Sequence, residues 1–222
     1  MIIIGHRGAR GLTPENTLAS LAKALEFGVD CIEFDLRVTK DGVVILNHDD
    51  YLHTEAGDKP KIAQNTYKKL KSLKPNLISF DEALDFINQK TDLYIEVKPG
   101  VDIKPIATII EARVAKGWKT DRLALGSFSQ QTLQELHQAM PEIKMIVIEK
   151  WSGVRARLRA RQVRTKTIAM NQLWLWSGFI KIMRHGGYEL YAYTLNNPTK
   201  VKKWAKHGLA GVVTDYPDRF KN

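Results

Sequence analysis

The sequence predicts an α/β fold, and a (β/α)8 barrel is the arrangement that we expect. Short β-rich runs recur along all 222 residues and alternate with stretches of helical period. Several of these runs are apolar at successive positions, as strands covered on both faces are. No polar linker interrupts the alternation, and the length suits one domain of ordinary size. We therefore expect a single domain over residues 1–222.

Nine runs are strand candidates, although a (β/α)8 barrel needs eight. They are residues 2–5, 31–38, 43–47, 93–97, 123–128, 145–148, 167–170, 190–194 and 211–214. The surplus lies around residues 40–42 (Lys-Asp-Gly), where a turn separates two runs with no room for a helix. A hairpin and an irregular unit both fit this spacing. A doubly wound open sheet is the alternative architecture, but no G-x-G-x-x-G motif follows the first run.

Helices are predicted between several of these strands. Residues 14–16 (Pro-Glu-Asn) indicate the start of one, with Thr13 as its N-cap and an apolar face that ends at Gly28. Asp81 is the expected N-cap of a second helix, which runs to Asn88. Two more helices are expected over residues 130–140 and 199–207.

The net charge of +10 is concentrated in one segment, because seven of the 34 basic residues lie within residues 150–166, which contain no acid. Three apolar residues lie there at helical spacing: Trp151, Val154 and Leu158. We therefore expect the arginines from Arg155 to Arg164 to form the solvated side of an ordinary barrel helix. Contact of this patch with a membrane surface is the alternative, and no nucleic-acid partner is expected.

The expected compartment is the cytoplasm. The one cysteine, Cys31, cannot form an internal disulfide, suits a reducing environment and is expected to be buried as a small hydrophobe. The opening residues MIIIGHRG lack the pattern of a secretory signal. The longest apolar stretch, residues 173–180, is far shorter than the ~18 residues that a spanning helix needs.

Charged side chains lie along or at the carboxyl ends of four predicted strands, where the catalytic groups of a (β/α)8 barrel are found. They are His6 and Arg7 on the first run, Glu33 and Asp35 on the second, His48 on the third, and Glu96 with Lys98 on the fourth. Two histidines at one rim can divide general acid and general base work, and two cations can hold an anion. This set indicates phosphate ester chemistry.

The acidic members of this set predict a metal site. Glu33 and Asp35 are two residues apart, so both side chains point to the same face of a strand. Glu96 and Lys98 have the same spacing on another predicted strand. Three converging carboxylates repel one another, and a divalent cation removes that repulsion. Oxygen ligands favour Mg²⁺, Ca²⁺ or Mn²⁺. Pairing of these carboxylates with a buried arginine or lysine is the structural alternative.

The chain resembles the glycerophosphodiester phosphodiesterase family. The segments that carry the resemblance are His6-Arg7-Gly8, Pro14-Glu15-Asn16-Thr17, Glu33-x-Asp35, Thr39-Lys40-Asp41-Gly42, His48-Asp49, Glu96-Val97-Lys98-Pro99, Ser127-Phe128, Tyr193-Thr194-Leu195-Asn196 and Gly211-Val212-Val213-Thr214-Asp215. They follow the family's order over nearly the whole chain. Tyr193 stands where the family more often has tryptophan, and the insertion around residues 49–76 is short and lysine-rich, which fits a surface cap over a comparatively open mouth.

The resemblance implies a barrel of the phospholipase C-like phosphodiesterase type that hydrolyses glycerophosphodiesters to glycerol 3-phosphate and an alcohol. It assigns one divalent cation to Glu33, Asp35 and Glu96, acid/base catalysis to His6 and His48, and the substrate phosphate to Arg7 and Lys98. It also implies attack of the glycerol 2-hydroxyl on phosphorus, followed by hydrolysis of a cyclic phosphate. The expected substrates are small, water-soluble diesters such as glycerophosphocholine.

Two other functions are open. Trp174 and Trp176 follow a predicted strand end and, with the arginine patch, suggest lysophospholipase D activity at a membrane surface. A non-catalytic barrel that binds anions or nucleic acid is the hypothesis from another class. Residues 15–17 are expected to brace the loop after the first strand, and Ser127 either reaches the site or packs. The remaining histidines are expected at the surface or at helix ends: His53, His137, His185 and His207.

Overall fold

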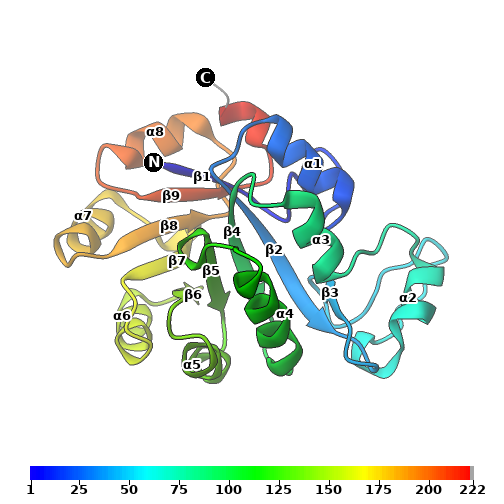
Figure 1. Ribbon diagram of the computed structural model, residues 1–222. Helices are drawn as coiled ribbons and strands as arrows, with labels where there is room; N and C mark the ends of the chain where they lie inside the picture. Colours follow the sequence, from blue (N-terminus) through cyan, green and yellow to red (C-terminus); the bar gives the residue numbers. More distant parts are fainter. Residues whose placement is uncertain (221–222) are drawn as a thin grey trace.

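The computed structural model describes residues 1–220 and shows a closed barrel of eight parallel strands (Figure 1). The strands are β1 (Ile2–Gly5), β2 (Cys31–Val38), β4 (Asp92–Val97), β5 (Leu123–Ser127), β6 (Lys144–Glu149), β7 (Thr167–Asn171), β8 (Glu189–Tyr193) and β9 (Gly211–Thr214). Each pairs in parallel with its neighbour, and β1 pairs with both β2 and β9. The second of these pairings closes the sheet, so the (β/α)8 prediction is confirmed and the open sheet is excluded.

The ninth strand is one arm of a hairpin. β3 (Val44–Leu46) runs antiparallel to β2, with Leu36 opposite Leu46. Thr39 organises the turn, because its hydroxyl donates to Asp41 (2.6 Å) and accepts from the backbone N–H of Val43 (3.0 Å). Of the two interpretations of the surplus run, the hairpin is therefore the one observed.

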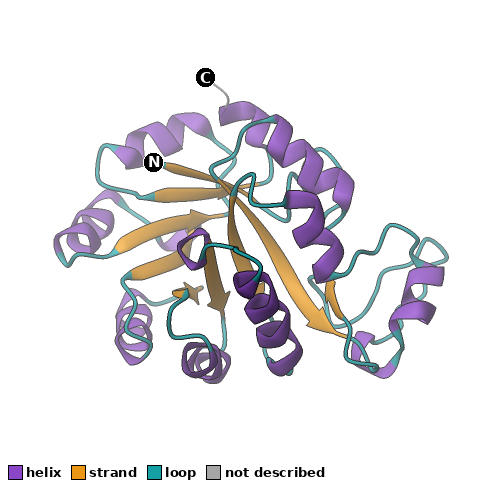
Figure 2. Ribbon diagram, in the orientation of Figure 1, coloured by secondary structure: helices purple, strands orange, loops and turns teal. Residues whose placement is uncertain are grey.

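Helices cover the outside of the barrel (Figure 2). They are α1 (Leu18–Glu26), α3 (Phe80–Ile87), α4 (Lys104–Ala115), α5 (Gln130–Ala139), α6 (Gly153–Gln162), α7 (Ser177–His185) and α8 (Pro198–Ala205). The main core lies between them and the strands, and a smaller cluster that includes Ile4, Ile146 and Tyr191 fills the barrel interior. α4 is not among the helices expected from the sequence, because its apolar residues lie on more than one face: Ile106 and Ile110 are buried, while Ile109 is only partly buried.

Two predicted helix caps were wrong. Thr17, rather than Thr13, caps α1 by accepting from the backbone N–H of Ser20. Asn16 has a left-handed backbone (φ 56°) and its side chain is hydrogen-bonded to Asp35, so the helix cannot begin at residue 14. α3 is capped by Ser79 instead of Asp81, in a capping box closed by Glu82.

The expectation for the arginine-rich helix holds for most of its arginines, since Arg155, Arg161 and Arg164 are exposed, but it is wrong for the apolar stripe. In α6 the residues that face the barrel are Ala156, Arg159 and Ala160, whereas Trp151, Val154 and Leu158 are exposed. Arg159 occupies the buried face because its guanidinium donates to the backbone oxygens of strand-end residues, including Ile148 (2.8 Å) and Phe128 (2.9 Å). Helical spacing identified the stripe but not the side of the helix that is buried.

The segment over residues 49–76 extends beside the barrel, where Figure 1 places α2 (Tyr67–Leu73) next to β3. It also holds a short 3-10 helix, η1 (Ile62–Gln64), and has a small apolar core of its own, formed with Ile45 by Leu52, Ile62, Leu70 and Leu77. Within residues 1–220, no helix is both long enough and apolar enough to cross a membrane. Cys31 is buried and free, as predicted.

Candidate active site

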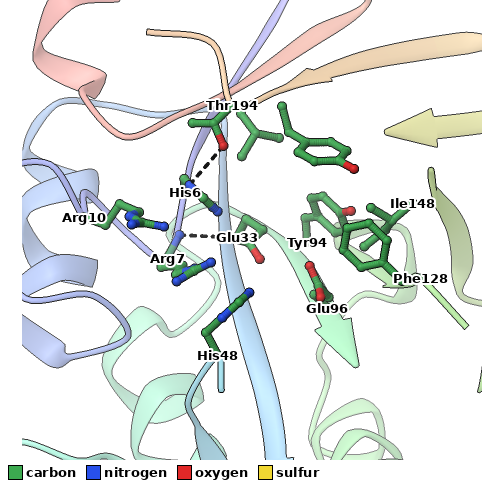
Figure 3. Close-up of a pocket in the computed structure, with 12 residues that line it drawn as sticks. His6, Arg7, Arg10, Glu33, His48, Tyr94, Glu96, Phe128, Ile148 and Thr194 are labelled. Atoms are coloured by element: carbon green, nitrogen blue, oxygen red, sulfur yellow. Dashed lines mark hydrogen bonds between the residues drawn. The ribbon is translucent and has the colours of Figure 1, made fainter. Parts of the chain in front are cut away.

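A cavity of about 240 Å³ lies at the carboxyl ends of the barrel strands. Figure 3 shows the side chains that line it. They include two histidines and two carboxylates (His6, His48, Glu33, Glu96), two arginines (Arg7, Arg10) and an apolar and aromatic wall (Tyr94, Phe128, Ile148, Tyr193, Val213). Five of the seven residues predicted for the site line this cavity, and the other two, Asp35 and Lys98, contact them from behind.

His6 follows β1 and is held by a carboxylate from the last strand. Its Nδ1 lies 2.6 Å from Oδ1 of Asp215, whose other oxygen accepts from Asn196 (2.9 Å). A carboxylate only accepts hydrogen bonds, so Nδ1 of His6 carries a proton and Nε2 is left for the cavity. Burial lowers the pKa of His6, and the hydrogen bond that His6 donates to Asp215 offsets part of that effect.

His48 has a partner of the same kind. Its Nδ1 lies 2.7 Å from Oδ1 of Asp49, and Oδ2 of Asp49 lies 2.8 Å from Nε2 of His53. Desolvation also lowers the pKa of His48, although its side chain is 39% exposed against 15% for His6. His53 lies at the surface, as predicted, and shares Asp49 with His48.

Three buried carboxylates, Glu33, Asp35 and Glu96, each bring one oxygen within 4.8 Å of the others. Strand register explains the cluster, because Asp35 on β2 lies directly opposite Glu96 on β4, and Glu33 is two residues earlier on the same face of β2. The sequence prediction that these side chains converge is confirmed.

Asp35 takes part in ion pairs that the structural alternative predicted. Nζ of Lys98 lies 2.5 Å from its Oδ1, and Nε of Arg7 lies 3.0 Å from its Oδ2. Burial alone would raise the pKa of Asp35, but Lys98 and Arg7 outweigh it and hold that pKa well below its usual value. Lys98 also pairs with Glu96. Within residues 1–220 the ion pairs of the three carboxylates therefore involve two basic side chains, those of Arg7 and Lys98.

Glu33 is the carboxylate left over. Its one hydrogen bond to the chain comes from the backbone N–H of Arg7 (2.8 Å), and within residues 1–220 no basic side chain forms an ion pair with it. Burial and the charges of Asp35 and Glu96 raise its pKa well above the usual value, and burial with the charge of Asp35 raises the pKa of Glu96 to about 7. A buried oxygen cluster with excess negative charge fits a hard divalent cation.

The loop after β1 is built around Gly8. Arg7 and Gly8 both have positive φ (50° and 84°), and a Cβ on Gly8 would lie 2.4 Å from Oγ of Ser20 in α1. Only glycine fits this close approach. The loop places the guanidinium of Arg7 between Asp35 and Glu15, with Nη1 donating to Glu15 at 2.6 Å. Together with Asn16, which donates to Asp35 (3.0 Å), Glu15 forms the brace predicted for residues 15–17.

Several residues at the site make contacts that the sequence did not predict. Asp215 and Asp49 were part of quoted motifs, yet their contacts with the histidines were not predicted. Asp215 follows the end of barrel strand β9, and Asp49 is next to His48 in the sequence; these positions are the signals that could have identified them. Ser127 packs instead of reaching the cavity, because its buried hydroxyl donates to the backbone oxygen of Val97 (2.7 Å). Tyr193 meets Phe128 edge to face, with ring centroids 6.0 Å apart.

A closed (β/α)8 barrel with histidines, carboxylates and arginines around a cavity at the carboxyl ends of its strands is the arrangement of a barrel hydrolase. Residues 6–219 match the model of the glycerophosphoryl diester phosphodiesterase family. The chain belongs to this family.

Individual relatives agree with this assignment. A glycerophosphodiester phosphodiesterase of Bacillus subtilis is 28% identical over 249 residues, which cover 99% of this chain and 85% of the relative. A phosphodiesterase of Oleispira antarctica, solved in complex with the product sn-glycerol-3-phosphate, superposes with a TM-score of 0.86 at 25% identity and covers 99% of this chain and 94% of that one. A human lysophospholipase D is 23% identical over 99% of this chain and 84% of its own length.

Proposed function

We propose that the protein hydrolyses glycerophosphodiesters to glycerol 3-phosphate and an alcohol. One observation carries the proposal: two histidines, each held at Nδ1 by an aspartate, line the same cavity as a cluster of buried carboxylates. The relatives named above support the substrate class, and the product complex of the Oleispira enzyme supports glycerol 3-phosphate as the product. The single free cysteine, Cys31, supports a cytoplasmic location.

The two histidines would exchange protons with the reacting oxygens. In the first step the glycerol 2-hydroxyl attacks phosphorus, one imidazole takes the hydroxyl proton, and the other protonates the departing alcohol, which leaves a cyclic phosphate. In the second step water opens the ring and the two imidazoles reverse their roles. Asp215 and Asp49 fit this scheme, because each fixes the Nδ1 proton and stabilises the imidazolium that forms.

Glu33, Asp35 and Glu96 would hold one divalent cation, of which Mg²⁺, Ca²⁺ and Mn²⁺ are the candidates. When bound, the ion would supply Lewis-acid stabilisation of the phosphate charge. The excess negative charge around Glu33 supports this assignment. Asp35 would share its oxygens between the ion, Arg7 and Lys98.

Arg7 and Lys98 are proposed to hold the substrate phosphate. Arg7 lines the cavity directly. Lys98 lies against Asp35 and Glu96, so its ammonium would act on the phosphate from behind the carboxylates. Arg10 is a further cation of the lining, and its Nε lies 3.6 Å from Oδ1 of Asp215.

A second candidate is lysophospholipase D activity. The name of the human relative favours it, and so does the exposure of Trp174 and Trp176 just after β7. In this case an acyl chain on the glycerol would lie along the apolar wall that includes Phe128 and Ile148.

The test is release of glycerol 3-phosphate from glycerophosphocholine and glycerophosphoethanolamine, with lysophosphatidylcholine assayed in parallel for choline release. We expect turnover of the soluble diesters that is lost in His6→Gln and His48→Gln. Faster turnover of the lysolipid that falls selectively when Trp174 and Trp176 are replaced by alanine would move the assignment to the second candidate. No turnover of either substrate class, combined with retention of RNA, would indicate a non-catalytic barrel.

A further inference from the structure

Exposed apolar side chains gather on one part of the surface. Thirteen large apolar residues are exposed within residues 1–220, and seven of them lie between residues 151 and 182, with exposed fractions from 48% to 80%. They are Trp151, Val154, Leu158, Leu173, Trp174, Trp176 and Ile182. Single exposed apolar residues are normal on a soluble protein, whereas a group of this kind marks an interaction surface.

These residues lie on α6, η3 (Gln172–Trp174) and α7 or just before them: Trp151 precedes α6, and Trp176 is the N-cap of α7. α6 and α7 are neighbours on the outside of the barrel (Figure 1). The rings of Trp151 and Trp174 meet with centroids 5.8 Å apart. The ring of Trp176 covers Gly178: a Cβ on Gly178 would lie 1.9 Å from Cζ3 of Trp176. Ile182 is one helical turn beyond Gly178, as Leu158 is one turn beyond Val154. We call this region, with its basic residues, the α6–α7 surface.

The charges of the α6–α7 surface have one sign. No Asp or Glu occurs from residue 150 to residue 188, and nine Lys and Arg residues do. Arg155 and Arg159 pair with Glu149. The other seven form no ion pair within the described part of the chain: Lys150, Arg157, Arg161, Arg164, Lys166, Lys181 and Arg184. The apolar stripe is therefore flanked by unneutralised cations.

We propose that the α6–α7 surface docks on a membrane that contains anionic lipids. Tryptophan favours the boundary between headgroups and acyl chains, aliphatic side chains enter the acyl region, and Lys and Arg interact with anionic headgroups. A second copy of the chain fits poorly, because a symmetric contact would bring two acid-free cationic faces together. Nucleic acid fits less well: the tryptophans could stack on bases, but the four exposed aliphatic side chains (Val154, Leu158, Leu173 and Ile182) would find no apolar partner in a nucleic acid.

The surface adjoins the active site. A hollow next to Trp151 is lined by Phe128 and Ile148, and both residues also line the catalytic cavity. Docking would therefore bring the rim of the barrel close to the lipid headgroups. Binding to vesicles requires neither metal nor turnover, so this inference and the proposed function can fail separately.

The experiment is flotation of the full chain with phosphatidylcholine vesicles, with and without phosphatidylglycerol. We expect binding only when phosphatidylglycerol is present, and weaker binding as salt is raised. The double variant Arg161→Gln with Lys181→Gln should bind roughly 30-fold more weakly, which corresponds to about 1 kcal/mol for each basic residue at an anionic surface. Trp174→Ala with Trp176→Ala should lose at least about tenfold.

Matched controls lie on α2, away from the α6–α7 surface. Lys68→Gln with Lys69→Gln makes the same change in charge, and Leu73→Ala removes an exposed apolar side chain; both should bind as the wild type does. Turnover of glycerophosphocholine should be unchanged in the Arg161/Lys181 variant. Absence of binding to the anionic vesicles, or equal binding by all variants, would overturn the proposal. So would a dimer in solution that dissociates in the tryptophan variant, or RNA capture that follows the same variants without vesicle binding.

Discussion

Nδ1 of His6 lies 2.6 Å from Oδ1 of Asp215, a residue 209 positions later in the sequence. The contact joins the first and last strands of the barrel, which pair in parallel and bring Gly5 opposite Thr214. Closure of the barrel therefore assembles one of the two histidine–carboxylate pairs of the site. His48 and Asp49, which are adjacent in the chain, form the other pair within a single turn.

Asp215→Asn is expected to lower kcat on the order of 100-fold or more. Asn196 donates to Oδ2 of Asp215, so the amide oxygen of the new Asn would face Asn196 and its NH₂ would face His6. That arrangement moves the imidazole proton to Nε2, where a general base needs a lone pair. Steady-state kinetics with glycerophosphocholine measure the effect. The control is Asp81→Asn, which changes an exposed carboxylate that pairs with Arg113. A wild-type kcat in a folded Asp215→Asn variant would contradict the role of Asp215 in positioning His6.

The pH dependence of kcat/KM should be bell-shaped, because the two histidines must begin in opposite protonation states. Burial lowers the pKa of both His6 and His48, which favours their neutral forms. The acidic limb, which reports the base losing its lone pair, should therefore lie below the ordinary histidine pKa of about 6.5. Profiles of the wild type and of His207→Gln should coincide. A profile that stays flat from mildly acidic to mildly alkaline pH is incompatible with paired-histidine catalysis.

Added Mg²⁺, Ca²⁺ or Mn²⁺ should raise the melting temperature of the chelator-treated protein. A cation at about 100 times its Kd stabilises by about 2.7 kcal/mol, or roughly 5–10 °C for a chain of this size. Glu33→Gln should abolish this rise. Without cation the variant should be as stable as the wild type or more so, because the raised pKa of Glu33 means that the fold disfavours its ionised form and loses stability above the ordinary pKa of a glutamate. Thermal unfolding measures the effect, and Glu26→Gln, at an exposed position, is the control. An unchanged rise in the melting temperature of Glu33→Gln on addition of cation would exclude Glu33 as a ligand.

Glu149→Gln should reduce the free energy of unfolding by roughly 2–3 kcal/mol at neutral pH. Burial alone would raise the pKa of Glu149, but hydrogen bonds from Arg155 and from the backbone N–H of Trp151 hold it at about 2. Since this is below the ordinary value of 4.5, the charged form stabilises the fold fully above pH 4.5.

That contribution is lost as the pH falls from about 4.5 to about 2. The difference between wild type and Glu149→Gln should therefore shrink over this interval, as measured by urea unfolding at several pH values. A difference that is constant with pH would mean that the ionised carboxylate is not the source of the stability.

The barrel was predictable because its strands are buried on both faces and appear as continuous apolar runs. The carboxylate cluster was predictable because carboxylates at alternate positions of a strand share a face, and register then brings Asp35 beside Glu96. Both inferences need only local patterns and the rule that catalytic groups lie at the carboxyl ends of barrel strands.

Other features depend on contacts between distant residues, which local patterns do not contain. Thr13 was predicted as the N-cap of α1, but Asn16 donates to Asp35 and is not helical, so the helix begins at Leu18. The buried side of α6 was misassigned because Arg159 takes part in hydrogen bonds to strand-end carbonyls, which a pattern of apolar spacing cannot show. Asp215 lies in one of the family motifs, but its contact with His6 depends on closure of the barrel, which the motif does not show.

The most direct test of the central claim is release of glycerol 3-phosphate by protein that has been stripped with chelator and resupplied with Mg²⁺, Ca²⁺ or Mn²⁺. We expect the stripped wild type to be inactive, at least one cation to restore release, and Glu33→Gln and His6→Gln to stay inactive with every cation. Full activity in the stripped protein, or restored activity in either variant, would contradict the central claim.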